Sequence, residues 1–178
     1  RGDGLEGGAG AGGGTLNVPD TGGYATPEEI RERFRYLSDR IHKRHPQVIF
    51  SAHCHDDLGM AVANSLAAVE GGVRQVECAI NGIGERAGNA SIEEVIMALH
   101  TRADRYGVTT GASPSHLVRA SKMLCEITET AIARNKAVVG INAFAPEAGI
   151  PQHGLLADSR TDEILRPTDV GLEGRGFV

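Results

Sequence analysis

Three times between residues 15 and 107, a short apolar run is followed by a polar loop and then by a helical pattern. The apolar runs lie at residues 15–18, 48–52 and 74–80, and the helical patterns begin near Thr26, Met60 and Ser91. Strands that alternate with helices pair in parallel, because each helix carries the chain back along the sheet. The sequence therefore predicts an α/β fold built on a parallel sheet.

Local signals support this division. Thr26 and Glu29 form a capping box with Pro27 at the first helical position, and Pro46 is expected to end that helix. Ser91 and Glu94 predict a second capping box, for a helix that ends near Gly107. A stripe of apolar residues at helical spacing marks the buried face of the first helix: Ile30, Phe34, Leu37 and Ile41.

The two ends of the chain have a different character. Residues 1–14 hold eight glycines, and because no strand precedes them and no helix pattern follows, we expect a disordered terminus and not a phosphate-binding loop. Residues 108–178 are expected to form a helical linker subdomain appended to the α/β segment at 15–107. Its first helix opens at Ser113-Pro114, with three apolar residues expected to face inward: Leu117, Leu124 and Ile127.

Composition excludes several classes of function. The net charge is −5 and no Lys/Arg cluster is present, so nucleic acid is not an expected partner. No apolar run approaches the length of a membrane span, and the N-terminus lacks the features of a signal peptide. The three cysteines, Cys54, Cys78 and Cys125, are widely spaced, which favours a reducing, cytoplasmic environment over a disulfide framework.

Each predicted strand ends in a polar loop, and the carboxyl ends of parallel strands lie at the same edge of a sheet, where functional sites are built. His53 and His55 alternate along the end of the second strand, so both side chains are expected on one face, where two imidazoles can hold a divalent metal. The alternative is two partly solvated histidines. Cys54 points to the opposite face and is expected to be a packed core thiol.

The segment HCHDDLG at residues 53–59, followed by NGIGERAGN at 81–89, resembles the 2-isopropylmalate synthase family. The segments PDT at 19–21, GYATP at 23–27 and NKAVVG at 135–140 extend the similarity over about residues 15–172. Homocitrate synthase, citramalate synthase and hydroxymethylglutaryl-CoA lyase share parts of these motifs.

The resemblance implies a TIM (β/α)₈ barrel, of which this chain holds only about the last three βα units. It implies a divalent metal (Mg, Mn or Zn) held by His53, His55 and Asn89, with a further Asp from the first barrel strand. It also implies a Claisen condensation of acetyl-CoA with a 2-keto acid, 3-methyl-2-oxobutanoate, to give 2-isopropylmalate and CoA, the first committed step of leucine biosynthesis, in a homodimer. Thr21 matches a position that contacts the keto acid, and Glu85 matches an active-site acid.

For three acidic residues the sequence leaves alternatives open. Glu85 and Arg86 can instead form a buried brace within their loop. Asp56 and Asp57 can orient the histidines as hydrogen-bond acceptors, or can cap the helix that follows them.

The chain departs from the family at four positions. Pro146 and Pro151 stand where the family has His, His153 where it has Asp, and Gly22 where it usually has Val. The second of those histidines assists catalysis on a neighbouring subunit in the family, and proline has no titratable group. We therefore expect a catalytically inactive fragment, from a copy of the gene that carries errors; resequencing of the source DNA tests the latter point.

Overall fold

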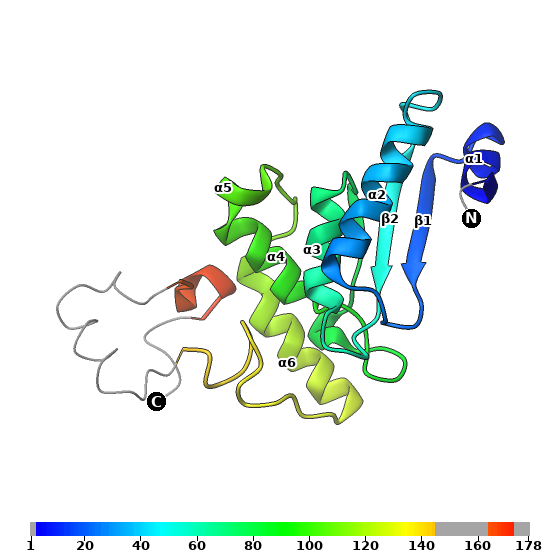
Figure 1. Ribbon diagram of the computed structural model, residues 1–178. Helices are drawn as coiled ribbons and strands as arrows, with labels where there is room; N and C mark the ends of the chain where they lie inside the picture. The colour runs from blue at the N-terminus through cyan, green and yellow to red at the C-terminus, as the bar shows by residue number, and fades with distance from the viewer. Residues whose placement is uncertain (1–2, 145–163, 173–178) are drawn as a thin grey trace. The chain divides into compact units, whose positions relative to one another are not determined.

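The computed structural model describes residues 3–144 and 164–172, and the chain divides into two compact units, Arg1–Val95 and Ile96–Val178. The N-terminal unit is built on three parallel strands in the order β1-β2-β3: β1 (Thr15–Asp20), β2 (Ile49–Cys54) and β3 (Gln75–Glu77). Figure 1 shows β1 and β2 side by side. The predicted parallel sheet is confirmed.

The two faces of this sheet differ sharply in polarity. Leu16, Phe50 and Ala52 point to one face and are buried in the apolar core of the unit. The register aligns Asn17 with Ser51 and Ser51 with Gln75 on the other face, and it aligns His53 with Glu77 one row further along. Because side chains alternate along a strand, the core and the polar rows lie on opposite sides of the sheet.

Helices α2 (Pro27–Ile41) and α3 (Ala61–Glu70) pack against each other and cover the apolar face. The predicted capping box of α2 is present, with Thr26 and Glu29 bonded reciprocally. Pro46 does not end this helix: α2 stops at Ile41 with His42 as its C-cap. Phe34 of α2 meets Phe50 of β2 edge to face at the centre of the core, their ring centroids 6.3 Å apart.

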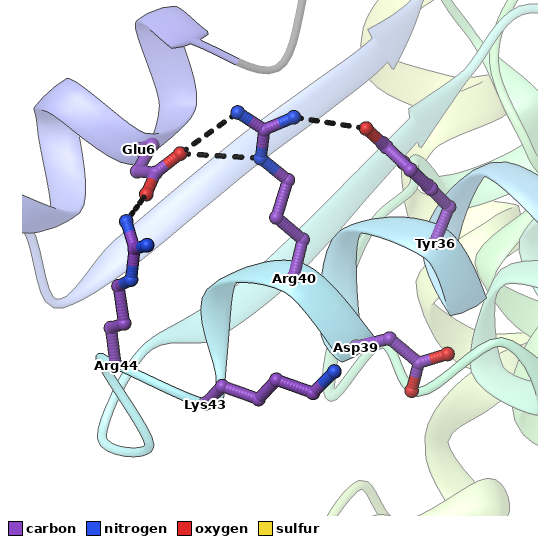
Figure 2. A pocket seen from close by; sticks show the side chains of 6 residues that line it. All are labelled: Glu6, Tyr36, Asp39, Arg40, Lys43 and Arg44. Carbon is purple, nitrogen blue, oxygen red and sulfur yellow. Dashed lines mark hydrogen bonds and ion pairs between the residues drawn. The ribbon is translucent and has the colours of Figure 1, made fainter.

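The expectation of a disordered N-terminus was wrong, because Asp3–Gly10 forms helix α1. Figure 2 shows how Glu6 of α1 joins it to the end of α2: Arg40 donates to Oε2 of Glu6 from Nε (3.2 Å) and Nη2 (3.1 Å), and Arg44 pairs with Oε1. The hollow around these groups, about 430 Å³ in volume, lies where α2 leads back to the start of β2. It is therefore at the edge opposite the histidines, the edge that in barrels serves stability.

Strand β3 is shorter than predicted and is followed by a 3₁₀ turn (Ile80–Gly82) instead of continuing to Ile80. Helix α4 (Ile92–Thr101) comes next, and the short helix α5 (Ala103–Tyr106) ends at Gly107, which has a left-handed backbone. The second predicted capping box is not formed, because the Ser91 hydroxyl is buried without a hydrogen-bond partner in the described part of the chain.

The C-terminal unit contains α5, a 3₁₀ turn (Pro114–His116), helix α6 (Leu117–Thr128) and a further 3₁₀ turn (Pro167–Val170). Leu117 is buried as predicted, but Ile127 is 74% exposed, so that part of the inward stripe was wrong. The unit begins at Ile96, earlier than the boundary expected near residue 108. Among the described residues, no helix is both long and apolar enough to cross a membrane.

Candidate metal and substrate site

His53 and His55 come together at the end of β2, as alternation along the strand predicts. Nε2 of His53 lies 3.1 Å from Nε2 of His55, and the two rings are tilted toward each other. Two nitrogens bound to one ion at about 2.1 Å lie roughly 3.0–3.4 Å apart. The spacing of the two imidazoles therefore fits a shared divalent ion.

Asn89 is held beside His55 by backbone pairing. The two residues form an antiparallel bridge, and the Asp56 N–H donates to the carbonyl of Gly88 at 3.0 Å. The side-chain nitrogen of Asn89 donates to the Ile83 carbonyl at 3.2 Å, whereas its oxygen Oδ1 is buried with no hydrogen-bond partner among the residues that the structure describes. An orphaned buried amide oxygen, on a residue whose backbone pairs with His55, is a hard oxygen donor available to a cation.

The protein side chains described do not complete a metal site on their own. Within residues 3–144 and 164–172, no group of three or more His, Cys, Asp or Glu side chains is placed to hold an ion. Whether these side chains fit a divalent ion therefore depends on Asn89. The remaining coordination positions of such an ion would be open to water, substrate or another part of the protein. The Asp ligand implied by the resemblance belongs to a strand that this sequence does not contain.

The structure separates the roles of the two aspartates that follow the histidines. Oδ1 of Asp56 accepts a hydrogen bond from the Ala61 N–H at 2.8 Å, so Asp56 caps the start of α3. Asp57 instead binds Arg86 and neither caps the helix nor contacts a histidine through any hydrogen bond recorded among the described residues. The capping alternative was correct for Asp56 alone.

Thr21 lies at the turn after β1, next to these loops. The buried carboxylate of Asp20 accepts from the Ala25 N–H at 3.3 Å, and the Gly23 N–H donates to the Asp20 carbonyl at 3.1 Å, so the turn is closed. Nη2 of Arg86 donates to the carbonyl of Thr21 at 2.7 Å. The loops after β1 and β3 are thereby joined.

Glu85 is exposed, with 77% of its side chain accessible. Its carboxylate lies 3.6 Å from Nη1 of Arg86, whose shorter contacts go to Asp57. The Glu85–Arg86 pair is therefore exposed and long, and the buried brace is not formed.

Cys54 is a core thiol, as predicted. It is 1% exposed, and burial raises its pKa to about 11. Burial likewise raises the pKa of Cys78 to about 11. Both groups are therefore protonated thiols at neutral pH.

One group at the site was missed from the sequence. Oε2 of Glu77 lies 3.1 Å from Nδ1 of His53. The sequence predicts only that Glu77 lies in the strand at residues 74–80, although its i, i+2 relation to Gln75 indicates that both side chains face the same side of the sheet. Pro146, Pro151 and His153, which bear on catalysis in the resemblance, lie outside the described residues.

Comparison with known proteins defines the class. Residues 6–124 match the HMGL-like family, and residues 138–178 match the family described as homocitrate synthase post-HMGL domain-like. The first match covers more than half of the chain, so this chain belongs to the HMGL-like family. A solved HMG-CoA lyase from Acenitobacter baumannii in complex with coenzyme A and 3-methylmalate shares the fold, with a TM-score of 0.58 and 22% identity over 71% of this chain and 41% of that one.

Within that class, the similar curated proteins are 2-isopropylmalate synthases. The chain is 55% identical to the enzyme of Methylobacterium nodulans over 92% of its own length, and 54% identical to that of Xanthomonas axonopodis pv. citri over 94%. It spans only 31% and 32% of the lengths of these two relatives. The predicted kinship is confirmed, and the three-stranded parallel sheet with its helices is a portion of an α/β barrel of this superfamily.

Proposed function

We propose that the protein carrying this chain condenses acetyl-CoA with 3-methyl-2-oxobutanoate to give 2-isopropylmalate and CoA. The observation that carries the proposal is the approach of the His53 and His55 Nε2 atoms to 3.1 Å. Asn89, whose backbone pairs with His55, adds a buried Oδ1 that has no hydrogen-bond partner among the described residues. Curated relatives at 52–55% identity are named 2-isopropylmalate synthase, and this name supports the choice of keto acid.

In this proposal His53, His55 and Asn89 hold the divalent ion, and their mixed N/O donor set suits Mg, Mn or Zn. When bound, the ion supplies a Lewis acid that polarises the ketone of the keto acid. Thr21 binds the keto acid from the closed turn after β1. Glu85 is the acid that protonates the substrate oxygen once the new carbon–carbon bond has formed.

The overall reaction balances as follows. A base takes a proton from the methyl group of acetyl-CoA, the resulting carbanion attacks the ketone carbon, and the ketone oxygen becomes a hydroxyl. Water then cleaves the thioester and releases the CoA thiol, which makes the condensation irreversible.

The proposal extends to the organisation of the whole protein. Residues 15–107 are the C-terminal part of the barrel, and residues 108–178 begin a helical linker subdomain of a homodimer. A cytoplasmic location agrees with the free thiols of Cys54, Cys78 and Cys125.

The test is thiol release from acetyl-CoA by the full-length protein with several keto acids, in the presence of Mg²⁺, Mn²⁺ or Zn²⁺. We expect the highest kcat/KM with 3-methyl-2-oxobutanoate, and a loss of about 10²–10⁴-fold in kcat for Glu85→Gln. Glu28→Gln, on the exposed first turn of α2, is the matched control and should leave the rate unchanged. Preference for pyruvate or 2-oxoglutarate would point to a citramalate- or homocitrate-type synthase instead.

For the 178-residue chain by itself we propose that no turnover occurs. Pro151 stands at the position of a family histidine and has no proton to transfer. Release of thiol by the isolated chain above the buffer rate contradicts this part of the proposal.

A further inference from the structure

Glu77 is the centre of a hydrogen-bonded cluster that crosses all three strands. Besides its contact with His53, its Oε2 accepts from Nδ2 of Asn17 at 3.3 Å, and its Oε1 accepts from the Ser51 hydroxyl at 3.3 Å. Ser51 accepts in turn from Nε2 of Gln75 at 3.1 Å. One carboxylate of β3 thus gathers donors from β1 and β2.

The geometry of this cluster fixes the state of the His53 ring. A carboxylate only accepts hydrogen bonds, so the neutral ring satisfies Glu77 by carrying its proton on Nδ1. Nε2 then keeps a free lone pair, and this is the atom that faces Nε2 of His55. A carboxylate that fixes both tautomer and orientation of a ligating histidine is a recurrent device at metal sites.

His53 and His55 differ in what holds their rings in place. Nδ1 of His55 is buried and has no hydrogen-bond partner within residues 3–144 and 164–172, whereas Nδ1 of His53 contacts the carboxylate of Glu77. The orientation of His55 comes from burial and from its backbone bridge to Asn89. His53 is part-exposed, with 27% of its side chain accessible, although its backbone is paired in the sheet with Pro19 and Glu77.

We propose that Glu77 is a positioning residue: it holds the His53 ring with Nδ1 protonated, so that Nε2 is presented to the ion shared with His55. Asn17 and Ser51 keep the carboxylate in place from the neighbouring strands. This inference rests on the proposed metal site and adds to it a residue that acts only through His53.

The experiment uses the full chain with Glu77→Gln, which keeps the shape, and Glu77→Asp, which keeps the charge but shortens the side chain by one methylene. Glu28→Gln on the surface of α2 is the control. The first readout needs no metal: two-dimensional ¹H–¹⁵N spectra of the histidine rings at about pH 8, where an ordinary imidazole is neutral, report which nitrogen carries the proton. The second is the affinity for Co²⁺, followed by its absorption. Circular dichroism melting curves check that each variant is folded.

We expect the wild type and Glu28→Gln to show His53 protonated on Nδ1. Both Glu77 variants should show a mixture of tautomers and bind Co²⁺ about 10–100-fold more weakly. An unchanged tautomer, or unchanged Co²⁺ affinity in folded Glu77→Gln, overturns the positioning role and leaves the metal site standing. Absence of Co²⁺ binding by the wild type overturns the metal site itself, and this inference with it.

Discussion

Arg86 and Asp57 form a two-pronged ion pair between the loops that follow β3 and β2. Nε of Arg86 donates to Oδ1 of Asp57 at 2.8 Å, and Nη2 donates to Oδ2 at 2.9 Å. The same Nη2 donates to the carbonyl of Thr21 after β1. A single guanidinium therefore fixes three neighbouring loops, and its planar fork is what makes this possible.

The ion pair predicts a pH dependence of stability. Hydrogen bonding to Arg86 holds the pKa of Asp57 below its ordinary value of 3.8. The folded state thus binds fewer protons at this group than the unfolded state, so the stabilisation is complete above the ordinary value and is lost as pH falls through the lowered pKa. Asp57→Asn should lower Tm at about pH 7, and the difference from wild type should vanish in strong acid.

Thermal unfolding monitored across this pH range measures the effect. Asp39→Asn, on the exposed face of α2, is a matched substitution that should follow the wild-type curve. A constant gap between Asp57→Asn and wild type from neutral to acid pH contradicts the assignment.

Gly84 is predicted to be essential for the placement of Asn89. A β-carbon at Gly84 would lie 2.5 Å from Nδ2 and 2.8 Å from Cγ of Asn89. The side chain of Asn89 is short, so Gly84→Ala must displace its amide and should weaken Co²⁺ binding about tenfold. Gly111→Ala, where a β-carbon meets nothing within 4 Å, should not change it. Calorimetric titration with Co²⁺ measures the affinity of both variants. Equal Co²⁺ affinities for the two would refute the role of Gly84.

Cys54 is predicted to resist alkylation. With a pKa of about 11, roughly one thiol in a thousand is ionised at about pH 8, and the sulfur is buried beneath α3. Iodoacetamide labelling followed by mass spectrometry should modify Cys125, which is half-buried, well before Cys54. In urea, which unfolds the chain, Cys54 and Cys125 should be labelled at similar rates. Faster labelling of Cys54 in the folded chain runs against its placement in the core.

Phe34 is predicted to contribute strongly to stability. Its ring is fully buried against Phe50, so Phe34→Ala should lower the free energy of unfolding by about 3–5 kcal/mol. Tyr24→Ala is the aromatic control: this side chain is 80% exposed, and its removal should cost less than about 0.5 kcal/mol. Urea unfolding curves measure both. Similar losses for the two variants would show that Phe34 does not anchor the core.

The fold of the N-terminal unit was predictable because its signals are local. The stripe of Ile30, Phe34, Leu37 and Ile41 is buried throughout, and the Thr26–Glu29 capping box set the start of α2. The predicted end of a helix or strand was less accurate where a contact with a residue distant in sequence determines that end. The chain leaves β3 early because Ala79 pairs with Ser91 and Asn81 adopts a left-handed backbone (φ 57°).

In the candidate site, too, local patterns predicted some residues, whereas others depend on contacts between distant parts of the sequence. His53 and His55 were placed on one face by alternation alone, and Cys54 on the other. Glu77 and the Arg86–Asp57 pair could not be assigned, because each joins residues that are far apart in sequence and requires the register of the strands or the path of two loops. The exposure of Ile127 likewise depends on packing that no periodicity records.

The polar rows of the sheet also govern how the chain behaves in water. Asn17 and Gln75 are exposed polar side chains on the face opposite the helices, so face-to-face stacking of copies gains little apolar burial. The flanks of β1 and β3, which pair with no further strand among the described residues, instead present open backbone donors and acceptors. Copies of this chain should therefore associate edge to edge, by strand addition. A peptide that pairs with the backbone of an edge strand should reduce this association more than detergent does.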